Sequence, residues 1–194
     1  MQRVPDRRIE LYQRRNFLGA DLAARLIGLI EEGRRPSTLA DHNGDGNFRT
    51  SETCDLSHEN PSVRALEDRL HELNGIDPAL GEPVQGQRYE VGQEFKPHTD
   101  YFTPGGQDFE KFCAVSGQRT WTFMVYLNEV EAGGATRFKT IGKTIRPERG
   151  KLLCWNNASP DGTMNPDTLH HGMKVRRGVK YIITKWYREK PWPW

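Results

Sequence analysis

Apolar side chains recur at helical spacing in the first part of the chain. Between residues 20 and 32, and again from Asn60-Pro61-Ser62 to Gly75, apolar positions fall three or four residues apart. This spacing predicts two amphipathic helices, because residues three and four apart share one helix face. Gly33 and Gly75 are expected to end them. The apolar positions are Leu22, Leu26, Ile27, Leu29 and Ile30 in the first helix and Val63, Leu66, Leu70 and Leu73 in the second.

After Gly81 the pattern changes to short β-type runs separated by Gly and Pro. The expected strands cover residues 87–91, 95–101, 119–127, 135–138, 151–155 and 180–187. Many short strands without intervening helices favour a double-sheet jelly roll. We therefore predict an α+β fold, in which a double-stranded β-helix (jelly roll) at residues 81–190 is supported by N-terminal helices at residues 1–80. We expect the two regions to form one compact unit.

Length and charge fit a single intracellular domain. A chain of 194 residues suits one substantial core, and its formal net charge is only +2. No long Lys/Arg block is present, so nucleic acid is not an expected partner. No apolar run of about eighteen residues and no apolar signal-peptide core occur, so we expect no membrane partner and a cytoplasmic location. The widely spaced Cys54, Cys113 and Cys154 are expected to be free thiols.

The segment Lys96-Pro97-His98-Thr99-Asp100 holds the strongest candidate chemistry. In an extended strand, alternate residues point to the same face, so His98 and Asp100 can reach one metal ion. A third ligand would have to come from elsewhere, and His170 and His171 are both candidates. Two histidines and one carboxylate with open positions are typical of non-haem Fe(II) oxygenases. The alternative for a single His-x-Asp pair is a solvated strand or turn.

Lys180 opens the last strand pattern, ten residues after His170. A lysine at the start of a strand is commonly exposed to solvent. Beside a metal, however, it could pair with the far carboxylate of a dicarboxylic keto acid. Tyr89 and Thr122, on neighbouring strand patterns, could add hydroxyl donors, or could be ordinary strand residues.

Residues Asp41 to Glu52 match the consensus sequence of an EF-hand calcium loop. An EF-hand also needs a helix at each end of its loop. Residues 33–37 break the incoming helix, and residues 51–61 lack helical periodicity. Arg49 occupies the ninth loop position, where an oxygen ligand or a bridging water is usual. The Asn, Asp and Gly residues of this segment are also typical of an ordinary polar loop, so calcium is not an expected ligand.

In combination, these motifs resemble the iron(II)- and 2-oxoglutarate-dependent dioxygenases of the prolyl 4-hydroxylase family. The resemblance covers residues 49–188. Its parts are Arg-Thr-Ser at 49–51, Arg-Tyr at 88–89, the segment at 95–101, Tyr-Leu-Asn at 126–128 and Gly-Gly-Ala-Thr-Arg-Phe at 133–138, then Pro-Asp-Gly at 160–162, Leu-His at 169–170, Gly-Val-Lys at 178–180 and Lys-Trp at 185–186. Departures at His171 and Lys174 concern the substrate mouth rather than the metal site.

The resemblance implies a role for each matching residue. His98, Asp100 and His170 would ligate Fe(II), and the ten-residue spacing to Lys180 selects His170 over His171. Lys180 would hold the 5-carboxylate of 2-oxoglutarate, with Tyr89 and Thr122 contacting the same cosubstrate. The implied substrate residues are Arg49, Ser51, Tyr101 and Trp186.

The implied reaction is hydroxylation of prolyl residues in a protein or peptide. It consumes O2 and 2-oxoglutarate, releases succinate and CO2, and uses L-ascorbate to restore oxidised iron. One alternative substrate is a free amino acid or another small molecule. A second alternative is a non-catalytic module that senses 2-oxoglutarate or a metal. The glycines and charges between Gly105 and Gly117 indicate a mobile lid.

Overall fold

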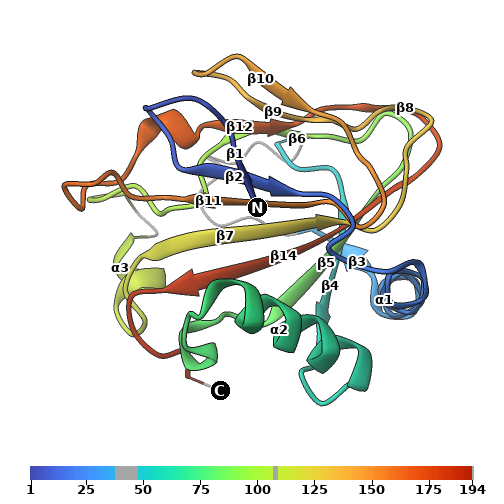
Figure 1. Cartoon of the computed structure of the whole chain (residues 1–194), viewed down its shortest axis with the longest axis horizontal. Coiled ribbons are helices and arrows are strands. Elements are labelled where there is room, and N and C mark those ends of the chain that lie inside the picture. The colour runs from blue at the N-terminus through green and yellow to red at the C-terminus, as the bar shows by residue number, and fades with distance from the viewer. Residues whose placement is uncertain (38–47, 107–108, 194) are drawn as a thin grey trace.

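The computed structural model describes residues 1–37, 48–106 and 109–193. Two antiparallel sheets lie one above the other, and two long helices cover the outer face of the larger sheet (Figure 1). In order across the larger sheet, the strands are β1 (Gln2–Arg3), β2 (Leu11–Arg14), β11 (Leu152–Asn156), β7 (Arg119–Tyr126), β14 (Lys180–Arg188), β5 (Val84–Tyr89), β4 (Glu52–Leu56) and β3 (Arg35–Pro36). The smaller sheet runs β10 (Lys143–Ile145), β9 (Thr136–Phe138), β12 (His170–Gly172) and β6 (Phe95–His98). A further pair joins β13 (Val175–Arg177) to β8 (Ala132–Gly133).

The long helices form where the apolar spacing predicts them. They are α1 (Ala20–Gly33) and α2 (Pro61–Asn74). Asn60 caps α2 by accepting a hydrogen bond from the Ser62 backbone amide, and Gly75 ends it with a left-handed φ of 65°. The remaining helical segments are short, namely α3 (Phe109–Cys113) and the 3₁₀ turns Pro78–Leu80 and Pro166–Thr168. No helix of the described ranges has the length and apolar content needed to cross a membrane.

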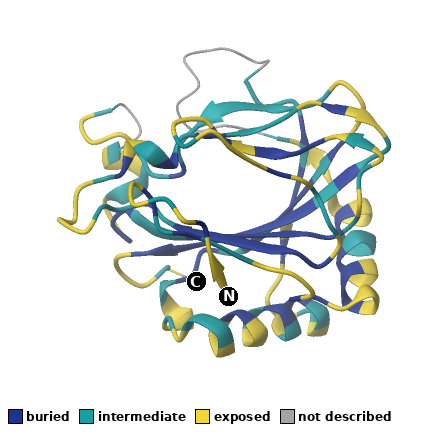
Figure 2. Ribbon diagram, turned by 45° about the horizontal axis from the view of Figure 1, so that its top comes forward, coloured by how far each residue is buried: buried dark blue, intermediate teal, exposed yellow. Residues whose placement is uncertain are grey.

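Alternation along the central strands divides the interior into two cores. One side of the larger sheet faces α1 and α2, while the other faces the smaller sheet (Figure 2). Phe123, Val125 and Ile183 pack on the helix side, whereas Met124, Tyr126 and Ile182 pack between the two sheets. Because the period of a strand is two, Lys180 lies on the same side as Ile182, between the sheets. The candidate site is therefore built into the second core.

The first eighty residues also contribute β1 to β4, which the hydrophobic pattern did not predict. Strands β1 and β3 have two residues each, too few to display a period. In β4, the neighbours Thr53 and Cys54 are both buried, so alternation is lost as well. β2 is placed by pairing with β11 and β4 by pairing with β5, and β1 and β3 pair with β2 and β4 in turn. Strands from both sides of residue 81 therefore share the larger sheet. The predicted strand at residues 95–101 ends earlier, at His98 of β6.

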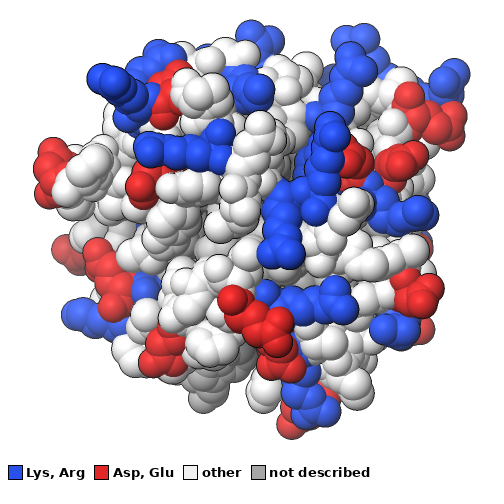
Figure 3. Space-filling view, in the orientation of Figure 1, with Lys and Arg blue, Asp and Glu red and all other residues white. Residues whose placement is uncertain are grey.

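Acidic and basic side chains are both present across the face seen in Figure 3, rather than being separated into regions of one sign. Ion pairs join several of the charged side chains of the described residues. Arg34 and Arg88 each lie 2.8 Å from a Glu52 carboxylate oxygen, and Arg15 lies 3.3 Å from Glu148. An exposed pair such as Arg15 with Glu148 contributes little stability. Cys54, Cys113 and Cys154 are free thiols, as predicted.

Candidate functional site

Two neighbouring strands of the smaller sheet bring His98, Asp100 and His170 together. His98 ends β6, and His170 begins β12 directly opposite it in the antiparallel register. Asp100 follows two residues later, in a bend beyond β6, so its approach does not depend on a continuous strand. β6 is an edge strand, which accommodates the missing amide hydrogen of Pro97. One ligand atom from each of the three side chains lies within 4.8 Å of the others.

Backbone carbonyls fix the orientation of both imidazoles. His98 Nδ1 lies 2.7 Å from the Lys96 carbonyl oxygen, and His170 Nδ1 lies 2.9 Å from the Thr168 carbonyl oxygen. A carbonyl can only accept, so each Nδ1 carries a hydrogen and Nε2 is the nitrogen of each ring left to face a metal. Burial, with the nearby His170 as a smaller contribution, lowers the pKa of His98 well below its usual value. The His98 imidazole is therefore neutral, as a metal ligand must be.

A buried hydrogen-bond chain orients the Asp100 carboxylate. The Thr122 hydroxyl donates to Asp100 Oδ2 at 2.7 Å, and the Asn157 side-chain amide donates to Thr122 at 3.0 Å. Asp100 Oδ1 remains on the side of the imidazoles, 3.9 Å from His98 Nε2 and 4.0 Å from His170 Nε2. Two imidazole nitrogens and one carboxylate oxygen thus converge, and the other polar atoms of the three side chains are engaged. This donor set fits a divalent first-row metal.

The structure distinguishes the two candidate histidines. His171 points to the other side of β12, where its Nε2 lies 3.1 Å from the Glu94 carboxylate. That contact, together with Lys174, lowers the pKa of Glu94. The side chain that joins His98 and Asp100 is His170, which the residues alone had left undecided.

Lys180 lies in a small cavity between the sheets, next to the three candidate ligands. The cavity lining includes Tyr89, Met124, Thr136 and Trp155 as well as His98, Asp100 and His170. Lys180 opens β14 opposite Tyr89 of β5, and its Nζ lies 5.0 Å from the Tyr89 ring centroid. Burial lowers the pKa of Lys180 to about 7. Among the described residues, no carboxylate forms an ion pair with it, so the cavity favours an anionic ligand.

A wider cleft adjoins this cavity and shares His98 and Asp100 with it. It is lined by Arg49, Tyr101, Phe102, Arg119, Trp186, Arg188 and Trp192, among others. Arg49 and Trp186 line both the cavity and the cleft, whereas Tyr101 lines the cleft alone. The fourth residue expected at the substrate, Ser51, is buried and accepts a hydrogen bond from Arg49 Nε at 3.0 Å. Ser51 therefore holds Arg49 rather than lining the cleft.

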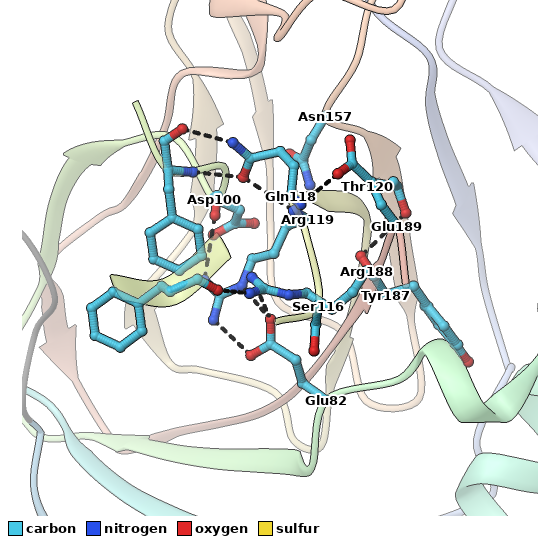
Figure 4. A network of polar contacts seen from close by, with 12 residues as sticks. Glu82, Asp100, Ser116, Gln118, Arg119, Thr120, Asn157, Tyr187, Arg188 and Glu189 are labelled. Carbon is cyan, nitrogen blue, oxygen red and sulfur yellow. Dashed lines mark hydrogen bonds and ion pairs between the residues drawn. The ribbon is translucent and has the colours of Figure 1, made fainter. Parts of the chain in front are cut away.

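Sequence reasoning missed a polar network in the cleft wall (Figure 4). The Arg119 guanidinium donates to both carboxylate oxygens of Glu82 at 2.6 and 2.8 Å, and also to the Asp100 backbone carbonyl at 3.3 Å. Gln118 clamps Phe102 by accepting from its amide at 2.8 Å and donating to its carbonyl at 2.7 Å. No local motif marks these residues, because they meet only through the tertiary fold.

Two loop predictions fall partly outside the described residues. The calcium-like letters Asp41 to Gly46 lie outside them, and Glu52, the last letter of that pattern, is engaged with Arg34 and Arg88 in β4. The segment expected to form a lid contains α3, and its residues 107–108 lie outside the described ranges. Phe112 of α3 stacks on Phe102 with ring centroids 5.2 Å apart.

Comparisons with known proteins point to one family. The sequence model of the 2OG-Fe(II) oxygenase superfamily matches residues 84–188. The probable prolyl 4-hydroxylase 10 of Arabidopsis thaliana is 31% identical over 197 residues, which cover 89% of this chain and 66% of that protein. Prolyl 4-hydroxylase subunit alpha-1 of Gallus gallus is 33% identical over 144 residues, which cover 74% of this chain but 28% of the subunit. The chain thus spans just under two thirds of the plant relative and little more than a quarter of the avian one.

Solved structures agree with these matches. A viral collagen prolyl hydroxylase from Paramecium Bursaria Chlorella virus-1, in its 2OG complex, superposes with a TM-score of 0.73 at 27% identity. That superposition covers 92% of this chain and 95% of the viral one. A Pseudomonas putida prolyl-4-hydroxylase superposes with a TM-score of 0.65 over 92% of each chain. At 18% identity, the second similarity concerns the fold alone.

Proposed function

The chain belongs to the prolyl 4-hydroxylase family of the 2OG-Fe(II) oxygenase superfamily, and on that premise we propose that it hydroxylates prolyl residues of a protein or peptide. In this reaction 2-oxoglutarate and O2 are consumed, and succinate and CO2 are released. The observation that carries the proposal is the meeting of His98, Asp100 and His170 beside the buried Lys180. A non-catalytic sensing module is disfavoured, because it would not need all four side chains in place.

His98, Asp100 and His170 would hold Fe(II). When bound, the iron with its cosubstrate and O2 supplies the oxidant for an unactivated C–H bond. The protein's contribution is to keep three ligands on one side in fixed orientations. Bonds from His98 and His170 to backbone carbonyls keep each Nε2 directed inward, and Thr122 holds the carboxylate. Thr122 thus orients a candidate metal ligand, and its direct contact with the cosubstrate stays a prediction of the family resemblance.

Lys180 would bind the distal carboxylate of 2-oxoglutarate in the cavity between the sheets. A dicarboxylic keto acid suits this place, because one end can reach the ligand triad while the other meets the ammonium group. The low polarity around Lys180 strengthens such an ion pair. Tyr89 lies beside the ammonium group and would share this contact.

The wider cleft would position the prolyl ring. Trp186 and Tyr101 offer flat walls next to the ligand triad, and Arg49, held by Ser51, stands at the boundary between cavity and cleft. Aromatic walls exclude water and pack well on a pyrrolidine ring. The Gly105 to Gly117 segment, with Phe112 packed on Phe102, would act as a lid over this cleft.

The proposal also covers the fold, the cellular location, the reductant and the partners of the protein. The two facing antiparallel sheets support a jelly roll at residues 81–190, joined in one compact unit with residues 1–80. The free thiols support a cytoplasmic location. L-ascorbate would restore iron oxidised in turnovers that do not reach substrate. The substrate remains a prolyl peptide in preference to a free amino acid, and nucleic acid, membrane and calcium are not proposed as partners.

Mass spectrometry tests the proposed reaction. The protein is incubated with Fe(II), 2-oxoglutarate, ascorbate and proline-rich peptides, with free proline as a separate substrate. We expect the peptides to gain one oxygen on proline with matching succinate release. His170→Ala should abolish iron binding and turnover, whereas the matched variant His171→Ala should largely retain both, since His171 faces Glu94. Succinate release that no prolyl substrate stimulates would contradict the proposed substrate, and loss of iron in His171→Ala alone would contradict the ligand set.

A further inference from the structure

Two guanidinium groups share one carboxylate in the wall of the substrate cleft (Figure 4). Arg119 donates to both carboxylate oxygens of Glu82, from Nε to Oε1 at 2.6 Å and from Nη2 to Oε2 at 2.8 Å. Arg188 Nη1 lies 3.3 Å from Glu82 Oε1, the oxygen that already accepts from Arg119 Nε. A single carboxylate neutralises only one of two cations. This part of the cleft wall therefore carries an excess positive charge.

The excess charge is buried, and it retains unused hydrogen-bonding capacity. The Arg188 side chain is 2% exposed. Its Nη2 donates to the Phe112 carbonyl oxygen, while its Nε has no hydrogen-bond partner among the described residues. An unmatched buried charge is costly, and leaving a buried donor unsatisfied adds to that cost. An anion entering the cleft would reduce both costs.

The rest of the cleft does not supply that anion. Arg49, the third guanidinium in the lining, donates to the neutral side chains of Ser51, Thr53 and Gln85. Asp55 lines the cleft but is exposed and ion-paired with Arg35. Asp100 belongs to the metal-ligand set. Glu189, next to Arg188 in the chain, is exposed, and its carboxylate accepts from the Gln118 backbone amide at 2.8 Å. Glu82 is thus the buried carboxylate that pairs with both interior cations.

Aromatic rings flank the two guanidinium groups. The Phe102 ring centroid lies 5.0 Å from the Arg119 guanidinium carbon and 5.2 Å from that of Arg188. Trp186 lies 3.9 Å from the Arg119 carbon, and Trp192 lies 5.6 Å from that of Arg188. Flat apolar walls around a cationic patch can hold both an apolar ring and a neighbouring carboxylate. A carboxylate also matches the planar donors of arginine.

We propose that Arg188, together with Arg119, binds a carboxylate of the substrate, so that this chain prefers prolyl peptides with an acidic group near the target proline. The proposal rests on the proposed prolyl hydroxylation and specifies its substrate class. The carboxylate can belong to an Asp or Glu side chain or to the C-terminus of the peptide. Arg119, which also contacts the Asp100 backbone, places this anion site directly beside the metal-ligand set.

Matched peptide pairs separate charge recognition from a purely structural role of Arg188. One pair differs by Asp against Asn next to proline, and a second pair ends at proline with a free carboxylate or an amide. Binding to the metal-free protein is followed by tryptophan fluorescence, since Trp186 and Trp192 line the cleft. KM and kcat are measured with the loaded enzyme. We expect the wild type to favour at least one acidic partner by roughly tenfold in Kd and KM, which corresponds to about 1.4 kcal/mol.

The variant Arg188→Gln should remove this preference, with little change in affinity for the neutral peptides. Lys190→Gln is the matched control, because it removes the same charge from an exposed residue outside the cleft lining. Arg188→Lys, which keeps the charge but loses the planar donors, should retain part of the preference. Circular dichroism confirms that each variant is folded.

Three outcomes of these measurements would overturn the proposed carboxylate site. Equal affinity of the wild type for the acidic and neutral partners in both pairs overturns it, as does an equal loss of preference in Lys190→Gln. Equal weakening of acidic and neutral peptides in Arg188→Gln assigns Arg188 a structural role and also overturns it. If no peptide is hydroxylated, the proposed function fails, while the fluorescence preference for acidic peptides still reports separately on the anion site.

Discussion

The hydroxyl group of Thr122 is expected to control metal affinity although it would not touch the metal. Thr122→Val keeps the shape of the side chain and removes the donor to Asp100 Oδ2. Thr122 is fully buried and Asp100 is 8% exposed, so water cannot easily replace the lost bond. The same change leaves the Asn157 amide, also fully buried, without its hydroxyl acceptor.

The size of the effect follows from these contacts. A hydrogen bond to a charged acceptor contributes about 1.5–3 kcal/mol, and loss of a group that orients a metal ligand typically weakens metal binding about 10- to 100-fold. We therefore expect Thr122→Val to bind Fe(II) or Mn(II) about 10- to 100-fold more weakly. Anaerobic titration calorimetry measures this difference directly.

Two variants control for causes other than the lost donor to Asp100. Thr122→Ser keeps the hydroxyl and should bind metal nearly as tightly as the wild type. Thr120→Val makes the same substitution two residues away in β7, where the hydroxyl donates to the Tyr187 carbonyl at 3.1 Å instead. Wild-type metal affinity in Thr122→Val, or an equal loss in Thr120→Val, would refute the reasoning.

The remaining predictions concern the buried lysine and a backbone turn. Since burial lowers the pKa of Lys180 to about 7 and the cosubstrate needs the ammonium form, 2-oxoglutarate affinity should fall about tenfold per unit as pH rises above 7. Calorimetry on the Mn(II)-loaded protein should find weak, pH-independent binding in Lys180→Met, and a pH-independent wild type would contradict this. Gly150→Ala should lose about 1–3 kcal/mol in urea unfolding, because φ is +73° and the added Cβ would lie 2.2 Å from the Leu18 carbonyl oxygen. Gly142→Ala, at φ +66° but in open space, should lose less, and equal losses would exclude the steric explanation.

The sequence predicts the long elements and the metal-ligand set for identifiable reasons. Helices α1 and α2 repeat their apolar spacing over several turns, so tertiary contacts reinforce the local preference. His98 and Asp100 are two residues apart, and their convergence is almost a local property. The choice of His170 over His171 is different. It depends on which face of β12 turns inward, a question of register that the family resemblance answered but local pattern could not.

The cleft wall could not be predicted in this way. Glu82, Arg119 and Arg188 lie near strand ends far apart in the chain, where charged residues are ordinarily solvated. Their burial results from the packing of β7 and β14 against the segment before β5, together with the aromatic rings that cover them. The contact of Thr122 with Asp100 also depends on the tertiary fold, which is why the sequence led us to expect Thr122 at the cosubstrate instead. Its inward direction could be predicted, but its bond to Asp100 depends on the bend that follows β6.

Buried positive charge links the two ligand sites. The core between the helices and the larger sheet is apolar and can supply stability without regard to ligands. Between the sheets, by contrast, Lys180 is buried without an ion-pair partner in the described ranges, and Arg188 shares a carboxylate with Arg119. Such groups cost stability until anions bind beside them. His98 and Asp100 line both the cavity and the cleft, so both proposed anion sites adjoin the candidate metal ligands. Under the two proposals, the same unbalanced charge would direct a dicarboxylate to the cavity and an acidic peptide to the cleft.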